Sequence, residues 1–201
     1  MKKLCTLMLA LTLSMGVMAQ DNFNTTLQQA KKGDAVAQYN IGVMYQNGMG
    51  VKQDYAKAFE WYTKAANQGD ASAQNNLGYM YKNGNGMQQD YQKAFEWYSK
   101  AANQGDADAQ FNLARMYENG TGVKQDYQRT VEWYTKAANQ DHAKSQNNLG
   151  AMYENGEGIN QDYKKAMEWY EKATTKINLC NRPKFRYNNA SAVVMHGRVW
   201  R

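Results

Sequence analysis

The pattern of hydrophobic and polar positions in this chain repeats along its length. One stretch, residues 47–70, reads NGMGVKQDYAKAFEWYTKAANQGD, and close copies begin at residues 83, 119 and 155. Within the copies a tryptophan column and a tyrosine column both recur every 36 residues. A fixed period of about 20–50 residues is typical of solenoids, in which each unit packs on its neighbours. The columns are Trp61, Trp97, Trp133 and Trp169, and Tyr45, Tyr81, Tyr117 and Tyr153.

Each unit predicts two helices. The first is expected over residues 35–46, because its apolar and small positions are spaced by three and four and so share one face. Asp34 can cap its start, and Gly48 and Gly50 end it, since glycine adopts positive φ at little cost. The second is expected over residues 55–67, with Asp54 as its cap. The apolar faces are Ala37, Ile41, Met44 and Tyr45, and Tyr55, Ala58, Phe59, Tyr62, Ala65 and Ala66.

Three further columns predict surface and packing roles. Glu60 precedes Lys64 by four residues, which is the favourable order for a surface ion pair, and the pair recurs in every unit. The tryptophans are expected to pack between repeats, with a ligand-stacking ladder as the functional alternative. A glutamine column lies beside small core residues, so we expect satisfied buried amides rather than a ligand-binding row. These glutamines are Gln38, Gln74, Gln110 and Gln146.

The consensus of the units is A-x-A-Q-x-N-L-G-x-M-Y-x-N-G-x-G-V-x-Q-D-Y-x-K-A-x-E-W-Y-x-K-A-A, and it covers residues 23–175. It resembles the Sel-one-like repeat (SLR), a relative of the tetratricopeptide repeat. The resemblance implies an all-α fold, a right-handed α-solenoid of antiparallel helix pairs whose first helices (A) line the concave side. It also implies a monomeric, non-enzymatic interaction scaffold, without a cofactor, that binds a protein or peptide in the concave groove.

The period divides the chain into segments. Residues 20–34 are half a repeat, because Phe23 aligns on Phe59 and Gly33 on Gly69, so they are expected to form an N-terminal capping helix. Four helix-pair repeats follow at 35–70, 71–106, 107–142 and 143–175. The basic tail, 176–201, loses the period and is expected to be disordered and dispensable. A degraded fifth unit, a frameshift product and a basic arm for an acidic surface remain alternatives.

Residues 1–19 run from basic to apolar to small, an order typical of a cleaved signal peptide. We therefore expect export to the periplasm or the medium, and no other segment is apolar enough to span a membrane. The first nineteen residues carry two lysines and the tail carries six basic residues, neither with an acid, so the net charge of +6 leaves −2 for the repeats. This argues against a nucleic-acid partner. Cys180 is the only cysteine after the signal peptide, which excludes an intrachain disulfide there.

Catalytic motifs give little support to an enzyme. The N-G-x-G turns lack the strand and the lysine of a phosphate-binding loop. The resemblance leaves a penicillin-binding or β-lactamase-like factor as the alternative, but the serine signature is absent and Thr121 with Lys124 is only a loose echo. The third junction departs from the pattern: Asp141 replaces a glycine, which predicts a weaker joint, and His142 is expected to be a solvated junction residue.

Columns that differ between repeats predict the partner-binding stripe. Core columns are alike because each neighbour presents the same surface, whereas variable columns are free of that demand. On the A helices the variable columns are Val36/Ser72/Asp108/Lys144, Tyr39/Asn75/Phe111/Asn147, Val43/Tyr79/Arg115/Ala151 and Gln46/Lys82/Glu118/Glu154. An invariant asparagine column lies beside them and offers both donor and acceptor to a peptide backbone. The expected partner-binding residues are Tyr39, Asn40, Val43, Asn76, Tyr79, Phe111, Asn112, Arg115 and Asn148.

Overall fold

The computed structural model describes residues 18–179, with side chains up to residue 174, and this part of the chain contains only helices and their connecting turns. An N-terminal helix occupies residues 18–31. Most of the predicted signal peptide and tail lies outside the described residues. The elements that follow are α2 (Ala35–Asn47), α3 (Tyr55–Asn67), α4 (Ala71–Asn83), α5 (Tyr91–Asn103), α6 (Ala107–Asn119), α7 (Tyr127–Ala138), α8 (Ala143–Asn155) and α9 (Tyr163–Leu179).

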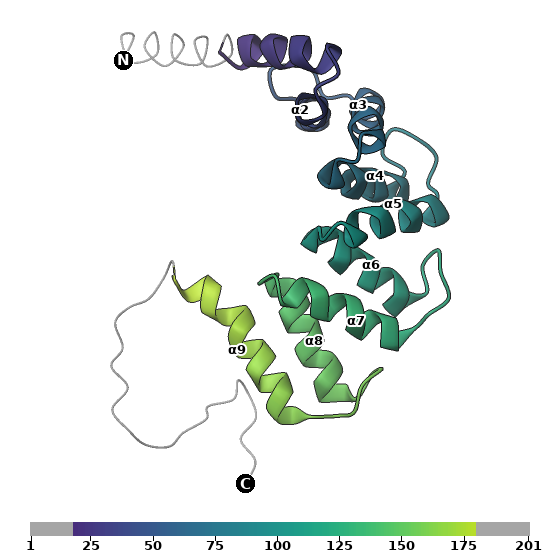
Figure 1. Ribbon diagram of the computed structural model, residues 1–201, viewed down its shortest axis with the longest axis vertical. Coiled ribbons are helices and arrows are strands. Elements are labelled where there is room, and N and C mark those ends of the chain that lie inside the picture. Colours follow the sequence, from purple (N-terminus) through teal and green to yellow (C-terminus); the bar gives the residue numbers. More distant parts are fainter. Residues whose placement is uncertain (1–17, 180–201) are drawn as a thin grey trace, which may run out of the picture.

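The helices pair into a curved array. Each A helix (α2, α4, α6, α8) packs on the B helix that follows it (α3, α5, α7, α9), and each B helix packs on the next A helix. Figure 1 shows the resulting crescent, with α2 on the inner side of the curve and α3 on the outer side. The predicted all-α solenoid of antiparallel pairs is confirmed, with its 36-residue period. None of the described helices is long and apolar enough to cross a bilayer.

Capping groups set the helix ends, because the first backbone N–H groups of a helix have no partner within it. The carboxylate of Asp34 accepts from the N–H of Ala37 at 2.8 Å, and that of Asp54 accepts from Lys57 at 3.0 Å. The same bonds recur in the later repeats, which confirms the predicted N-caps. Gly48 ends α2 in the left-handed region at φ 70°, and its N–H donates to the carbonyl of Met44.

The core is a row of similar clusters, one at each joint. Tyr62 is fully buried against Gly42, where an added Cβ would lie 2.5 Å from its Cδ1, so only glycine lets the ring pack this closely. Between repeats, a B-helix phenylalanine meets the tyrosine of the next A helix edge to face. Phe23, in the N-terminal helix, makes this contact with Tyr45 at 5.4 Å, as Phe59 does with Tyr81 at 5.5 Å. The N-terminal helix therefore packs as a B helix does.

The glutamine column is buried and bonded, as predicted. The side-chain amide of Gln38 donates to the Ala30 carbonyl at 3.1 Å, and its oxygen accepts from Gln68 at 2.7 Å. Gln68 also donates to the carbonyl of Gly33 at 2.9 Å. One buried amide thus joins the N-terminal helix, α2 and the end of α3. The same clasp recurs at Gln74 with Gln104 and at Gln110 with Gln140.

The tryptophan column packs between repeats, but the expected Glu–Lys pairs mostly do not form. Trp61 lies against the cluster around Ile41, and the Nζ of Lys64 sits over its ring at 4.1 Å from the centroid. Lysines at the same column cover the other three tryptophans. Among the described residues only Glu132 and Lys136 form the predicted i,i+4 pair, at 2.7 Å. Lys136 makes both contacts, since it also lies 3.9 Å from the centroid of Trp133, so the tryptophan contact is the one common to all four repeats.

The last helix continues past the predicted end of the repeats. The tail was expected to be disordered from residue 176, yet α9 runs to Leu179, so that expectation is wrong for residues 176–179. Lys176, Ile177, Asn178 and Leu179 include neither glycine nor proline, and nothing in their backbone chemistry stops a helix. The rest of the predicted tail lies outside the described residues.

Candidate partner-binding groove

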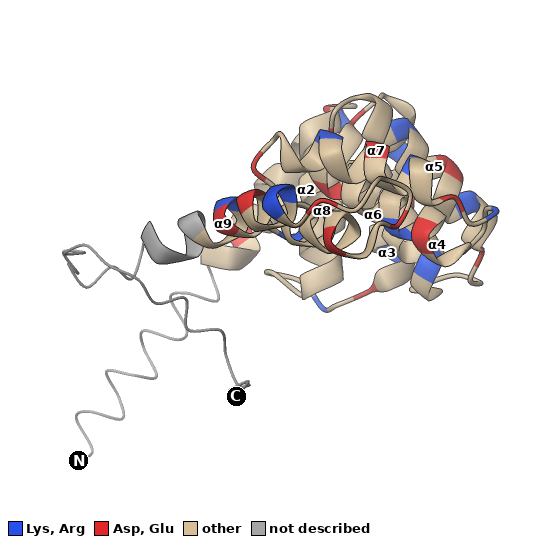
Figure 2. Ribbon diagram, turned by 90° about the horizontal axis from the view of Figure 1, so that it is seen from below, with Lys and Arg blue, Asp and Glu red and all other residues tan. Residues whose placement is uncertain are grey.

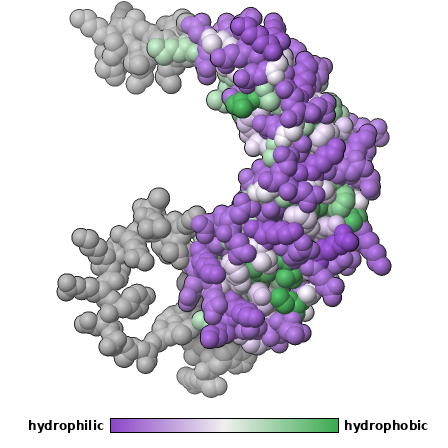
Figure 3. Space-filling model, in the orientation of Figure 1, coloured by the Kyte–Doolittle hydropathy of each residue, from purple (hydrophilic) through white to green (hydrophobic). Residues whose placement is uncertain are grey.

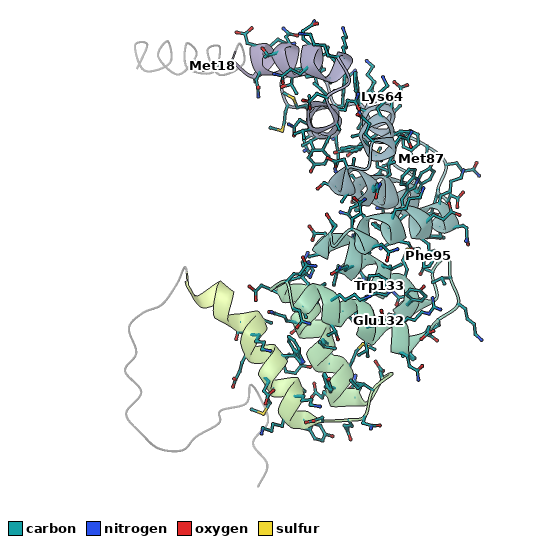
Figure 4. All side chains as sticks on the ribbon, in the orientation of Figure 1. Met18, Lys64, Met87, Phe95, Glu132 and Trp133 are labelled. Carbon is teal, nitrogen blue, oxygen red and sulfur yellow. The ribbon has the colours of Figure 1, made fainter. Side chains whose placement is uncertain are left out.

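The variable columns of the A helices lie outside the core. Ala37 and Ile41 are at most 4% exposed, whereas Val36 is 63% exposed and Tyr79 is 48% exposed. Arg115 is exposed on α6, at the column of Tyr79. Figure 4 places Met87, in a turn, and Phe95, on a B helix, toward the outer edge of the crescent. The exposed stripe of the A helices therefore belongs to the inner side, which we call the groove.

Three of the expected partner-binding residues also pack against the core. Tyr39 is half-buried and its ring lies 5.8 Å from that of Tyr62. Phe111 lies 5.8 Å from Tyr134 and 5.0 Å from the ring of His142. Val43 packs against the cluster around Tyr62. These side chains therefore present one face to the groove and the other to the core, while Tyr79 and Arg115 extend into solvent.

The asparagine column has internal hydrogen-bond partners in at least two of its four copies. Asn148 donates to the hydroxyl of Tyr134 at 2.8 Å, and Asn112 donates to the side chain of Asn75 at 3.1 Å. Burial raises the pKa of the Tyr39 and Tyr62 hydroxyls, and the nearby amide of Asn76 opposes this shift to a smaller extent. Asn40 is exposed. An asparagine has two amide hydrogens and a carbonyl, so each retains capacity for a further bond.

A second tyrosine column, on the B helices, is largely buried beneath the groove. Its hydroxyls are hydrogen-bonded in three of the four repeats. The hydroxyl of Tyr62 donates to Gln46 at 2.8 Å, that of Tyr134 to Glu118 at 2.8 Å and that of Tyr170 to Glu154 at 2.7 Å. In the second repeat the acceptor column holds a lysine, Lys82. The buried hydroxyl of Tyr98 has no hydrogen-bond partner among the described residues.

Charged side chains of both signs stand at each edge of the groove: Asp108 and Lys144 where the A helices begin, and Lys82, Glu118 and Glu154 where they end. Where the A helices begin, Asp70, Asp106 and Asp108 all raise the pKa of Tyr39, so they lie near it, although burial is the larger cause. Where they end, burial and the neighbouring Arg115 lower the pKa of Lys82. Over the rest of the surface acidic and basic residues are interspersed (Figure 2). The described part of the chain therefore offers no broad basic face to a nucleic acid.

A pocket of about 410 Å³ opens between α6, α8 and α9. Phe111 forms part of its wall, and the remaining lining combines small apolar side chains with a lysine and two asparagines. The face in Figure 3 is otherwise largely hydrophilic, with hydrophobic side chains in small separate groups. The lining residues are Phe111, Ala143, Lys144, Asn147, Asn148, Ala173 and Thr174.

His142 is not the solvated residue that we expected. Its Nδ1 accepts from the N–H of Ser145 at 3.2 Å, which makes it the N-cap of α8. Its Nε2 lies 3.2 Å from the carboxylate of Asp108, and only 15% of the side chain is exposed. Phe111 covers the ring. The expectation was wrong because Asp108 and Phe111, both in the preceding repeat, lie against the imidazole ring. Asp141 does adopt the left-handed region, at φ 62°.

The arrangement supports binding better than chemistry. Among residues 18–174, no three histidine, cysteine or acidic side chains gather as metal ligands do. Thr121, the loose threonine echo, lies in the turn after α6, where its N–H donates to Met116 at 3.0 Å. The sequence placed Lys82 and Lys144 in the variable columns but not among the expected partner-binding residues, and it did not place His142 in the groove at all. Each of these residues differs in charge from the residues at the same position in the other repeats, and this difference could have indicated a functional role.

Comparison with known proteins agrees with the repeat pattern. The family model of the Sel1 repeat matches residues 35–70, 71–106, 107–142 and 143–176. The chain is similar to c5321, a protective antigen of uropathogenic Escherichia coli with an SLR fold, at 37% identity and a TM-score of 0.75, over 78% of this chain and 34% of that one. It is similar to a Sel1 repeat protein from Oxalobacter formigenes at 34% identity and a TM-score of 0.75, over 81% of this chain and 64% of that one.

A shorter likeness links the chain to the sel1-like repeat-containing protein L18 of Acanthamoeba polyphaga mimivirus. The two are 51% identical over 37 residues, which is 18% of this chain and 6% of that protein. The chain thus spans about a third of the E. coli antigen, a little under two thirds of the Oxalobacter protein and a small part of the viral one.

Proposed function

We propose, because this chain belongs to the Sel1 repeat family, that it is a non-enzymatic scaffold that holds a protein or peptide partner in its groove. Sel1 repeats generally mediate interactions between proteins. The chain's own contribution to such a role is the set of side chains that differ between its otherwise similar repeats.

The observation that carries the proposal is the separation of repeated from variable positions. The residues of the repeated columns cap the helices, form the glutamine clasps and make the buried tyrosine–glycine contacts. The variable columns stand together on one face, where Tyr79 and Arg115 are exposed. Aromatic residues and arginine are common anchors in protein interfaces. A partner that lies along the groove contacts a different residue at each repeat, and these differences can fix the position of the partner relative to the repeats.

The pocket supplies a second point of contact. Phe111 and Ala173 provide an apolar wall for one side chain of the partner, while Lys144 and Asn147 stand at polar positions of the lining. A volume of about 410 Å³ is ample for a large aliphatic or aromatic side chain. Tyr79 lies two repeats away from this pocket on the same face, so an extended partner reaches both.

Export is the second part of the proposal, and it rests on the order of residues 1–19. Ala19 stands 36 residues before Tyr55, the first residue of α3, so removal of residues 1–19 leaves the N-terminal helix to begin at Gln20. Mass spectrometry of the protein from the periplasm or medium should find Gln20 as the first residue. An intact Met1 in exported material would overturn this part.

Selection of short random peptides on the purified chain tests the binding role. Tyr79→Ala and Arg115→Ala should weaken the selected peptides by on the order of tenfold, because both side chains are exposed in the groove. Lys124→Gln, in an exposed turn, is the matched control and should not change affinity. The proposal fails if no peptide is selected, or if the peptides bind the groove variants as well as they bind the unaltered chain.

A further inference from the structure

The second repeat breaks the hydrogen-bond rule of its neighbours. In the other three repeats the tyrosine hydroxyl donates to a side-chain oxygen sixteen residues earlier, at the C-terminal end of the A helix. In the second repeat that position holds Lys82, an ammonium that has only donors to offer. Tyr98 is 0% exposed and its hydroxyl is left without a partner among the described residues.

A second cation stands beside this position. Asn112 on α6 donates to Asn75 on α4 at 3.1 Å, and Arg115 and Tyr79 lie one turn further along the same two helices. Consistent with this placement, Arg115 adds to burial in lowering the pKa of Lys82. Neither Lys82 nor Arg115 has an ion pair within the part of the chain that the structure describes. Glu118, one turn after Arg115 on α6, is engaged by the hydroxyl of Tyr134.

Local stability does not account for this cluster. A cation near the end of a helix is favoured by the helix dipole, which explains one lysine or one arginine. It does not explain two unpaired cations on neighbouring A helices, of which one is part-buried, near a buried hydroxyl that lacks the acceptor found in the other repeats. Glutamine or glutamate fills the same column in the other repeats and removes every one of these defects. An anion placed between the two cations also removes them.

We propose that Lys82 and Arg115, with the hydroxyl of Tyr98 behind them, form an anion subsite of the groove that takes a carboxylate side chain of the partner. The proposal rests on the proposed function and names the chemistry of its partner as an acidic peptide segment. The guanidinium of Arg115 can engage both carboxylate oxygens, and Lys82 adds a point charge. The subsite lies in the middle of the array, with Tyr39 on one side and the pocket at Phe111 on the other. A chain that continues in both directions offers an internal aspartate or glutamate rather than a terminal carboxylate.

The peptides selected on the unaltered chain are the probe. They should share an aspartate or glutamate at one position, and changing it to the amide should weaken binding by on the order of tenfold or more. Lys82→Gln and Arg115→Gln should weaken the acidic peptides similarly, while Lys124→Gln, with the same charge change, should not. In the Lys82→Gln variant the amide swap in the peptide should cost clearly less, because the two groups no longer interact.

The outcomes separate the two proposals. If peptides bind and respond to Tyr79→Ala, yet show no acidic preference and tolerate Lys82→Gln and Arg115→Gln, the subsite is wrong and the binding role stands. If binding is lost on amidation of the peptide C-terminus, and not on loss of an internal acid, the assignment to a side chain is wrong. If no peptide binds the groove, the binding role itself fails and the subsite fails with it.

Discussion

Replacing Lys82 with glutamine should make the protein more stable, although it removes a charge from a surface-facing position. The change restores the side-chain oxygen that Gln46 supplies to Tyr62 at 2.8 Å in the first repeat. The hydroxyl of Tyr98, which has no partner among the described residues, then gains an acceptor at the same offset along the chain. The part-buried ammonium beside Arg115 is removed at the same time.

The size of the effect follows from the hydroxyl. An unsatisfied buried polar group costs about 1–3 kcal/mol, and a neutral hydrogen bond contributes about 1 kcal/mol to folding. Because the lysine is only part-buried, we take about 1 kcal/mol for the whole change. In a domain of this size, 1 kcal/mol raises the melting temperature by about 2–4 °C. Gln46→Lys should lower it by a similar amount, since it creates the same defect at Tyr62.

The assay is thermal unfolding followed by far-ultraviolet circular dichroism, repeated across alkaline pH. Burial and Arg115 hold the pKa of Lys82 below its ordinary value of 10.5. The folded protein therefore releases this proton before the unfolded chain does, and its stability rises as pH increases through the folded pKa toward 10.5. The advantage of Lys82→Gln should consequently narrow over that range. Equal melting temperatures for the two proteins, together with a neutral Gln46→Lys, would refute the reasoning.

Three further predictions concern the repeat itself. Asp141→Gly should raise the melting temperature and Gly105→Asp should lower it, each through a change of about 1 kcal/mol or less in the free energy of unfolding. The reason is that φ is 62° at Asp141 and 95° at Gly105, values that only glycine adopts freely. Unchanged melting temperatures in both variants would contradict this. Gly78→Ala should cost about 1–3 kcal/mol in urea unfolding, because its Cβ would lie 2.6 Å from Cδ1 of Tyr98, and a neutral result would mean that the ring shifts at little cost. Acid unfolding should begin below about pH 4. The bond from the Lys57 N–H holds the pKa of Asp54 below its ordinary 3.8, so the stability that this carboxylate contributes above pH 3.8 is lost as pH falls through the folded pKa. Asp54→Asn should therefore make the melting temperature depend less on pH in this range.

The fold could be predicted from the sequence because its interactions are local or repeat at a fixed offset. Helix starts depend on Asp34 and Asp54, whose bonds reach three residues along the chain. Packing between repeats follows from the period, since contacts between repeated residues, such as that of Phe59 with Tyr81, recur 36 residues later. The helical end of α9 was missed for a related reason: the prediction followed the loss of the period, whereas a helix needs only the absence of breaking residues.

The groove was only partly predictable. Variation between repeats correctly predicted that Tyr79 and Arg115 are exposed. It also predicted that Phe111 is available to a partner and has no role in packing. In the structure Phe111 packs on Tyr134 and His142, so its replacement should also lower stability. The contact of His142 with Asp108 links two repeats through residues that are not repeated, so no spacing in the sequence reveals it.

The glutamine clasps have a consequence for how a protein of this kind changes length. Each clasp joins groups at constant offsets, so Gln68 bonds Gln38 just as Gln140 bonds Gln110, thirty residues back. Duplication or deletion of a whole 36-residue segment that carries the clasp preserves these bonds at the joints on either side of it. The number of repeats can therefore change in whole steps, so that the length of the groove changes while its curvature is kept. Gene duplication is then able to alter the length of partner that the groove accommodates without any new packing solution.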